Sequence, residues 1–131
     1  MTLQERLFES RLKGHCCSQT IMALCIEDLG RENEDLIAAM AAFCNGMGQG
    51  KICGTLAAAV AALYVADASA AQGYMQDDLM EWFGDTYGGY DCFEIIHDDP
   101  VKRAELCPMI VMETYRKLQE LLRIGEGVDE H

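Results

Sequence analysis

Cysteine thiols are the side chains in this sequence that could carry out the widest range of chemistry, and there are 7 of them in 131 residues. Four stand at predicted helix starts or breaks: Cys17, Cys53, Cys92 and Cys107. At a helix start, unpaired backbone amides and the helix dipole stabilise negative charge, which favours the thiolate. Thiolates ligate metals and attack disulfides. These four residues are therefore the candidate site.

Several kinds of sulfur chemistry fit these four residues. Four thiolates together suit a tetrahedral zinc ion or an iron–sulfur cluster, and two pairs could instead form reversible disulfides. No Cys-x-x-Cys occurs, so the zinc-knuckle, ferredoxin and thioredoxin spacings are absent. On spacing alone, simple burial of the cysteines has equal weight with metal or redox use. Convergence of the thiols has to come from the fold.

The remaining cysteines and two histidines are candidates of lower rank. Cys25 and Cys44 fall on apolar faces in the middle of predicted helices, where cysteine acts as a small hydrophobe. Cys16 suits either burial or an accessory place at the site. His15 and His97 each lie close in sequence to one of the four cysteines. They are possible accessory ligands or proton carriers, although isolated loop histidines are more often plain surface residues.

The charge around Cys92 also bears on its chemistry. Acidic residues surround it in the sequence: Asp91, Glu94, Asp98 and Asp99. Negative neighbours raise the pKa of a thiol, so a free nucleophilic Cys92 is disfavoured unless a cation is bound. This pattern mildly favours metal binding over free-thiol chemistry.

The glycine-rich loop before Cys53 resembles a phosphate-binding loop in its glycine spacing, but its flanking residues do not match that motif. It follows a helix rather than a strand, and Ile52 stands where serine or threonine is required. We expect Gly50, Gly54 and Thr55 to form a loop that delivers Cys53 to a helix start and lets another part of the chain approach closely.

The elements that must position these residues are predicted to be helices. Capping and spacing signals predict helices near residues 3–12, 16–29, 33–47, 53–72 and 77–87, a helical turn near 91–96, a start at Asp99-Pro100 and a last helix beginning at Cys107-Pro108. The sequence thus predicts an all-α, single-domain bundle over residues 1–131, with five or six helices around a central alanine-rich helix. Residues 126–131 are expected to be a frayed tail.

Composition limits the partners and the compartment. The net charge of -12 opposes binding to nucleic acid and to anionic lipid surfaces. The apolar stretch 56–71 carries Asp67 and is short for a membrane span, and the N-terminus lacks a signal-peptide pattern. We expect a cytoplasmic protein without membrane insertion, a redox partner protein, and room for a homo-oligomer through an exposed helical face.

The cysteine order resembles a known family. Cys17, then Gly50-x-x-Cys53-Gly54-Thr55-Leu56-Ala57-Ala58, then Cys92 and Cys107 resemble the C-GCAxxG-C-C family of redox-active proteins, over about residues 16–122. Thr55 replaces an alanine of the family motif, and Ala58 replaces its last glycine. A glycine-to-alanine change leaves less room for whatever approaches there, so an unchanged ligand geometry does not follow.

The resemblance implies a helical domain whose four cysteines act together in redox or metal chemistry. A similar helical domain accompanies the haem domain of split-Soret cytochromes, where an iron–sulfur centre has been suspected. By that analogy an iron–sulfur cluster is preferred to zinc, with electron transfer as the role. A structural zinc adaptor and a helical binding domain with purely structural cysteines stay open. No base–nucleophile pair is visible, so the residues assign no reaction.

Overall fold

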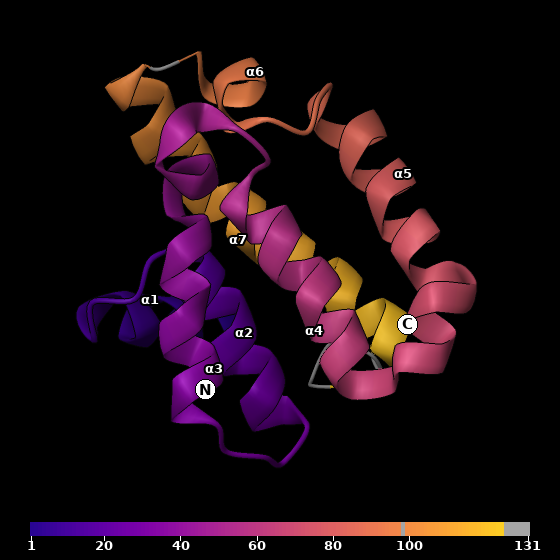
Figure 1. Cartoon of the computed structure of the whole chain (residues 1–131). Coiled ribbons are helices and arrows are strands. Elements are labelled where there is room, and N and C mark those ends of the chain that lie inside the picture. Colours follow the sequence, from indigo (N-terminus) through magenta and orange to yellow (C-terminus); the bar gives the residue numbers. More distant parts are fainter. Residues whose placement is uncertain (98, 125–131) are drawn as a thin grey trace.

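Helices supply all the longer regular elements of the computed structural model, which describes residues 1–97 and 99–124 (Figure 1). Within these residues, the only β-type pairing is one isolated bridge between Ile52 and Asp91. The helices are α1 (Leu3–Leu12), α2 (Cys17–Asp28), α3 (Glu34–Ala39), η1 (Met40–Phe43), η2 (Gly46–Gly50), α4 (Gly54–Ala70), η3 (Ala71–Met75), α5 (Gln76–Tyr87), α6 (Cys92–Ile96) and α7 (Pro100–Leu122). The predicted all-α fold is confirmed. The expected tail at 126–131, like Asp98, lies outside the described residues.

The alanine-rich α4 is the central helix, as predicted. It packs against α2 and α7, and Figure 1 shows it running between α2 and α5 with α7 behind it. Ala58, Ala59 and Ala62 are fully buried along it. Because these side chains are small, the neighbouring helices can approach α4 closely. Leu56 and Leu63 of the same helix complete its buried face.

The break between α4 and α5 does not lie at Gly73, where the sequence placed it. The helical run continues from Gly54 to Tyr87, over 34 residues, and Gly73 lies inside it. The backbone leaves helical geometry at Asp67, whose carboxylate accepts a hydrogen bond from the Ala70 amide at 3.0 Å. Asp67 therefore acts as a cap within the run, which explains the reversal between α4 and α5 in Figure 1.

This run is also long and apolar enough to cross a membrane by length and composition alone. The mean hydropathy of its most apolar 18-residue window is 1.4, and 44% of that window is buried inside the domain. A central helix in a helical core has the same properties. The change of direction at Asp67 further separates the run from one straight span.

The last helix is longer than predicted. Pro108 lies inside α7 rather than starting a new helix at Cys107. Proline removes one backbone hydrogen bond from a helix interior and opposes its continuation. Burial of Ile110, Val111 and Tyr115 on the core face of α7 offsets this cost and keeps the helix continuous.

The predicted third helix is shorter than residues 33–47. Asn33 caps it as expected, accepting a hydrogen bond from Leu36, but α3 ends at Ala39 and a 3-10 turn follows. The backbone is extended at Cys44 and left-handed at Met47, so Met47 is exposed instead of packed. Cys44, at which the backbone becomes extended, forms a disulfide that is described below.

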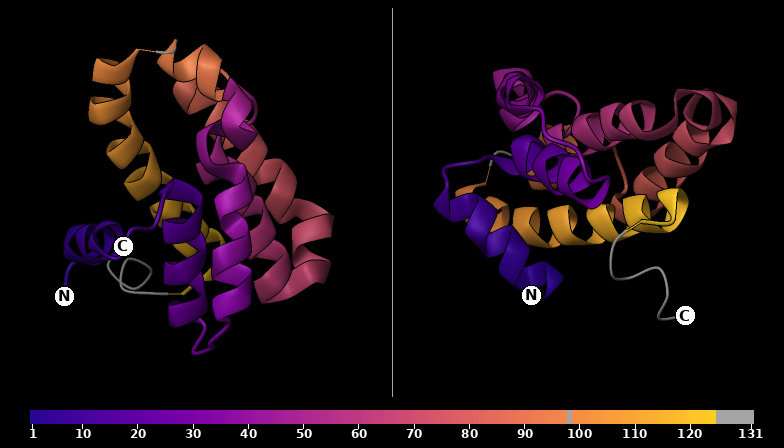
Figure 2. Two further views of the ribbon diagram at one scale, coloured as in Figure 1. Left: turned by 60° about the vertical axis from the view of Figure 1, so that its left-hand side comes forward. Right: turned by 90° about the horizontal axis from the view of Figure 1, so that it is seen from below.

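A buried polar network joins the helices that surround the cysteines. The Arg6 guanidinium of α1 forms an ion pair with the Asp28 carboxylate of α2 at 2.8 Å. The Tyr115 hydroxyl of α7 donates to the same carboxylate at 2.6 Å. Asp28 thus fixes α1 and α7 against α2. Figure 2 shows α1 and α7 on the side of α2 that faces away from α3.

Candidate functional site

The four predicted cysteines line one small cavity of about 30 Å³. They come from four different elements: Cys17 begins α2, Cys53 precedes α4, Cys92 begins α6 and Cys107 lies within α7. The remaining lining residues are Asn45, Thr55, Ile95, Ile96, Arg103 and Ile110. The fold therefore brings together thiols that are as many as 90 positions apart in the sequence, from Cys17 to Cys107.

Backbone pairing places Cys53 beside Cys92. The Cys53 amide donates to the Tyr90 carbonyl at 2.8 Å, and the Cys92 amide donates to the Lys51 carbonyl at 2.7 Å. These two bonds lie on either side of the isolated bridge. They hold the segment that precedes α4 against the segment that precedes α6. A pair of short, extended segments thus positions two helix starts side by side.

Glycine is required at two positions of the family motif, Gly50 and Gly54, for two different structural reasons. Gly50 has a φ of 68°, in the left-handed region that favours glycine. Gly54 has no such φ, but a Cβ there would collide with the Phe43 carbonyl oxygen and lie 3.5 Å from the Cys17 sulfur. Gly54 is therefore what lets the start of α4 approach the backbone at Phe43. Thr55 is buried and lines the cavity, and Ala58 is fully buried in the core.

Cys53 and Cys92 are neighbouring buried thiols that line this cavity. Hydrogen bonding from the Cys53 thiol, helped by the positive charge of Arg103 and opposed by burial, lowers the pKa of Cys92 to about 6 from its ordinary 9.0. The hydrogen bond to Cys92 and burial raise the pKa of Cys53. The shared proton therefore stays on Cys53, and Cys92 is the thiolate of the pair.

This finding corrects the pKa shift expected for Cys92 from its acidic neighbours. Asp91 does raise the pKa of Cys92, but the hydrogen bond from Cys53 and the charge of Arg103 outweigh it. The Glu94 carboxylate accepts hydrogen bonds from backbone amides at the start of α6, including that of Asp91 at 3.2 Å. Arg103 comes from α7, so its contact with Cys92 is tertiary and is not visible in the local sequence.

Cys107 differs from the other three because it lies in the middle of a helix. The predicted thiolate stabilisation by a helix start is thus wrong for this residue. Burial raises the pKa of the Cys107 thiol, and the nearby Cys17 raises it further. Both Cys17 and Cys107 are half-buried, more open than the Cys53–Cys92 pair.

Cys16 and Cys44 form a disulfide, with their Cα atoms 6.2 Å apart. The prediction that Cys44 is a core hydrophobe is wrong, whereas Cys25 is fully buried as expected and burial raises its pKa to about 12. The Ser18 hydroxyl lies 3.3 Å from the Cys16 sulfur and 3.4 Å from the Cys44 sulfur. Nothing in the spacing of two cysteines 28 positions apart signals this pairing.

The two histidines have different placements. His15 Nδ1 lies 2.9 Å from the Ser10 hydroxyl, and His15 lines a large groove beside the thiol cavity. His97 ends α6 with a left-handed φ of 57° and is exposed. It does not line the thiol cavity.

The thiol cavity has donor atoms that suit a metal, but not in a ligating arrangement. Four cysteine thiols are a suitable donor set for zinc or an iron–sulfur cluster. Among the described residues, however, no group of three or more His, Cys, Asp or Glu side chains has a spacing that could hold a metal ion. A cavity of about 30 Å³ has room for one or two water-sized atoms. As placed here, the sulfurs form a thiol pair with two neighbours rather than a ligand set.

The fold and the site together define the class of protein: a cysteine-rich helical domain with four thiols around one cavity. A family model described as "Putative redox-active protein (C_GCAxxG_C_C)" matches residues 15–121. The chain belongs to this family, which confirms the resemblance seen in the cysteine order. No curated protein and no solved structure shows significant similarity to the chain.

Proposed function

We propose that the chain is a thiol–disulfide redox protein in which Cys92 is the attacking thiolate and Cys53 the resolving thiol. The observation that carries the proposal is the pair of buried thiols, Cys53 and Cys92, which backbone pairing places side by side in one cavity with Arg103. A thiolate is the nucleophile in disulfide exchange, and a second thiol next to it can close the cycle. Membership of the redox-active family supports the same class of chemistry.

The proposed half-reaction begins with attack on a substrate disulfide. The Cys92 thiolate bonds to one substrate sulfur, the substrate S–S bond breaks, and the other sulfur leaves as a thiolate that takes a proton from water. Cys53 then attacks the Cys92 sulfur, and its proton passes to the second substrate sulfur. That sulfur leaves as a thiol, and a Cys53–Cys92 disulfide forms. Two electrons pass to the substrate, and a dithiol of a redox partner protein returns them by the reverse exchange.

Access to the buried pair runs past the two more open thiols. Cys53 and Cys92 are each only 7% exposed. Cys17 and Cys107 line both the thiol cavity and the large groove, together with Asn45 and Arg103. We assign Cys17 and Cys107 to the wall of the route by which a substrate disulfide reaches Cys92 from the groove.

Trapping of the intermediates tests the proposal. Cys53→Ser should accumulate a mixed disulfide at Cys92 when it is treated with a small organic disulfide, because the resolving sulfur is gone. Cys92→Ser should accumulate none at Cys53, because burial still raises the pKa of the Cys53 thiol in that variant. Cys25→Ala is the matched control, since Cys25 is buried outside the cavity. Equal trapping in both serine variants, read by peptide mass spectrometry, would contradict the assignment.

A metal centre is a second proposal, and the donor set is what favours it. Cys17, Cys53, Cys92 and Cys107 would hold an iron–sulfur cluster, or zinc as the alternative, and the cluster would supply one-electron transfer. Binding of either the cluster or zinc would require the four sulfurs to move from their present positions. Anaerobic purification, an absorption spectrum, and metal and sulfide analysis test it. A colourless protein with less than stoichiometric metal would rule out this second proposal and leave the first intact.

A further inference from the structure

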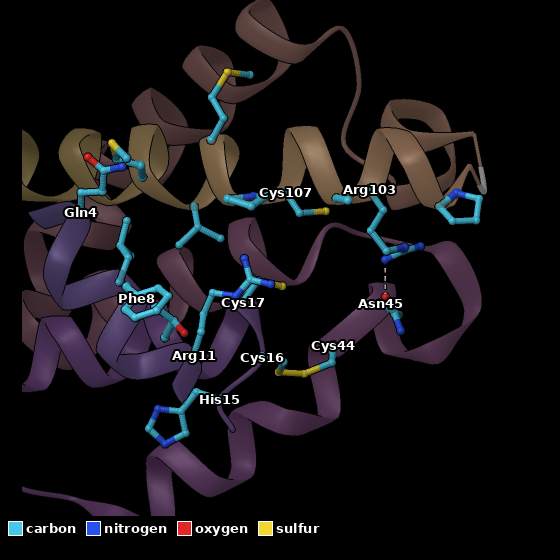
Figure 3. Close-up of a pocket in the computed structure, with 18 residues that line it drawn as sticks. Gln4, Phe8, Arg11, His15, Cys16, Cys17, Cys44, Asn45, Arg103 and Cys107 are labelled. Atoms are coloured by element: carbon cyan, nitrogen blue, oxygen red, sulfur yellow. Dashed lines mark hydrogen bonds between the residues drawn. A yellow bond between two sulfur atoms is a disulfide. The ribbon is translucent and has the colours of Figure 1, made fainter. Parts of the chain in front are cut away.

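A groove of about 740 Å³ lies beside the thiol cavity, between α1, α2 and α7 (Figure 3). Much of its wall is apolar, formed by Leu7, Phe8, Pro108, Met109, Val111 and Met112. Phe8 is 63% exposed and Met109 is 42% exposed, so the groove presents large apolar side chains to solvent. Its volume falls in the range of about 300–1,000 Å³ that is typical of small-molecule sites.

The charges in the groove have the opposite sign to the protein as a whole. The chain has a net charge of -12, yet no aspartate or glutamate lines the groove among the described residues. Its charged side chains are Arg11 of α1 and Arg103 of α7. In Figure 3 the Arg11 side chain extends into the space between these helices, and Arg103 extends from α7 toward Asn45.

Both guanidinium groups have capacity for a further partner. Within residues 1–97 and 99–124, neither Arg11 nor Arg103 forms an ion pair with a carboxylate. Arg103 donates to the Asn45 side-chain oxygen and also faces the Cys92 thiol, whose pKa its charge lowers. A guanidinium has five N–H donors, so these contacts leave donors of Arg103 available to an anion. Two cations without a carboxylate partner, beside an apolar wall, match a ligand that is itself both anionic and apolar.

We infer that this groove binds a small organic anion with an apolar body. Arg11 and Arg103 hold the anionic group, and the apolar residues of α1 and α7 pack against the body. A polyanion is disfavoured, because two arginines would have to overcome the repulsion of an acidic surface. The bound molecule lies against Cys17, Cys107 and the Cys16–Cys44 disulfide, which also line the groove.

This inference concerns binding and goes beyond the proposed redox function, since binding needs no thiol exchange. The probe for the test is 8-anilinonaphthalene-1-sulfonate, which has an apolar aromatic body and one sulfonate. N-phenyl-1-naphthylamine has the same body without the charge and serves as the neutral probe. Fluorescence titration of the full chain gives stoichiometry and affinity for both.

Three variants locate the site. Arg11→Gln removes a groove cation, and Lys13→Gln removes an equal charge at the end of α1 outside the groove lining. Ala104→Trp places a bulky side chain in the groove wall at an exposed position of α7. We expect one sulfonate probe per chain, an affinity about tenfold lower in Arg11→Gln, and less than a twofold change in Lys13→Gln. Ala104→Trp should weaken both probes, with an unchanged helical circular dichroism spectrum.

Equal effects of Arg11→Gln and Lys13→Gln on the sulfonate probe would overturn the inference, as would binding that Ala104→Trp leaves unchanged. So would a dimer in sedimentation whose dissociation is needed before either probe binds, because the occupant would then be a second copy. Cys92→Ser separates this test from the redox proposal. Probe binding that persists while disulfide exchange is lost keeps the two independent, and exchange without probe binding overturns only the groove site.

Discussion

The shared proton of the Cys53–Cys92 pair gives the sharpest prediction. Replacing Cys53 with alanine removes the S–H donor that is the main cause of the lowered pKa of Cys92. The Cys92 pKa should then rise from about 6 toward its ordinary 9.0. Cys53→Ser is the matched control, because its hydroxyl keeps a donor at the same place. The Cys92 pKa should stay low in the serine variant.

The size of the effect follows from the thiolate fraction. At pH 6 about half of Cys92 is thiolate when its pKa is about 6, against roughly 0.1% when its pKa is 9.0, a ratio of about 500. Intrinsic nucleophilicity falls with pKa, and over three pKa units this lowers the rate about 20-fold. Cys92 in the natural chain should therefore react about 25 times faster at pH 6 than Cys92 in Cys53→Ala.

Iodoacetamide labelling with peptide-level mass spectrometry resolves each cysteine and measures these rates from pH 5 to 10. Limited access of the reagent to Cys92 slows the reaction at every pH by the same factor, so it does not move the midpoint of the pH profile. A lowered pKa means that the thiolate persists above about pH 6 and is lost below it, so the rate should rise through a midpoint near pH 6. A midpoint near 9 in the natural chain, or equal profiles for alanine and serine, would refute the reasoning.

Three further predictions concern stability, each measured by urea unfolding at pH 7. Gly54→Ala should destabilise the fold by about 1–3 kcal/mol, because the added methyl collides with the backbone. Gly73→Ala, with no atom near the added methyl, should stabilise the fold by about 0.5–1 kcal/mol. Equal effects of the two substitutions would contradict the close approach of Gly54 to Phe43. Tyr115→Phe should cost about 1.5–3 kcal/mol, because its hydroxyl donates to a buried carboxylate; a neutral change would show that this network is not stabilising. Reducing the Cys16–Cys44 disulfide should cost up to about 3.5 kcal/mol from its 28-residue separation, and Cys16→Ser should abolish the difference between oxidised and reduced protein.

Local signals predicted the helices well where a side chain caps its own helix. Thr2 and Glu5 form a capping box at the start of α1, where a helix near residues 3–12 was predicted, and Asp99 caps α7 just before Pro100. The alanine-rich composition of residues 56–71 also identified the central helix. These features depend on residues within one turn of each other, so a sequence carries them directly.

Features that depend on distant contacts were not predictable. Pro108 stays inside α7 because the core face on its C-terminal side is buried, which the local proline rule does not include. The Cys16–Cys44 pairing and the approach of Arg103 to Cys92 both join segments that only the tertiary fold brings together. The cysteine order identified the four thiols of the cavity, but not which one holds the proton.

The glycine-rich stretch between Cys44 and Cys53 is tied at both ends to sulfur chemistry. One end is crosslinked to Cys16, and the other ends at Cys53 of the cavity, while Cys16 itself adjoins Cys17 of the same cavity. Any shift of this stretch on opening the crosslink therefore changes the free energy of the cavity thiols. By thermodynamic reciprocity, oxidation of the cavity thiols must change the ease of opening the crosslink by the same amount. The redox states of the crosslink and of the cavity thiols are in this sense thermodynamically linked through one segment of the chain.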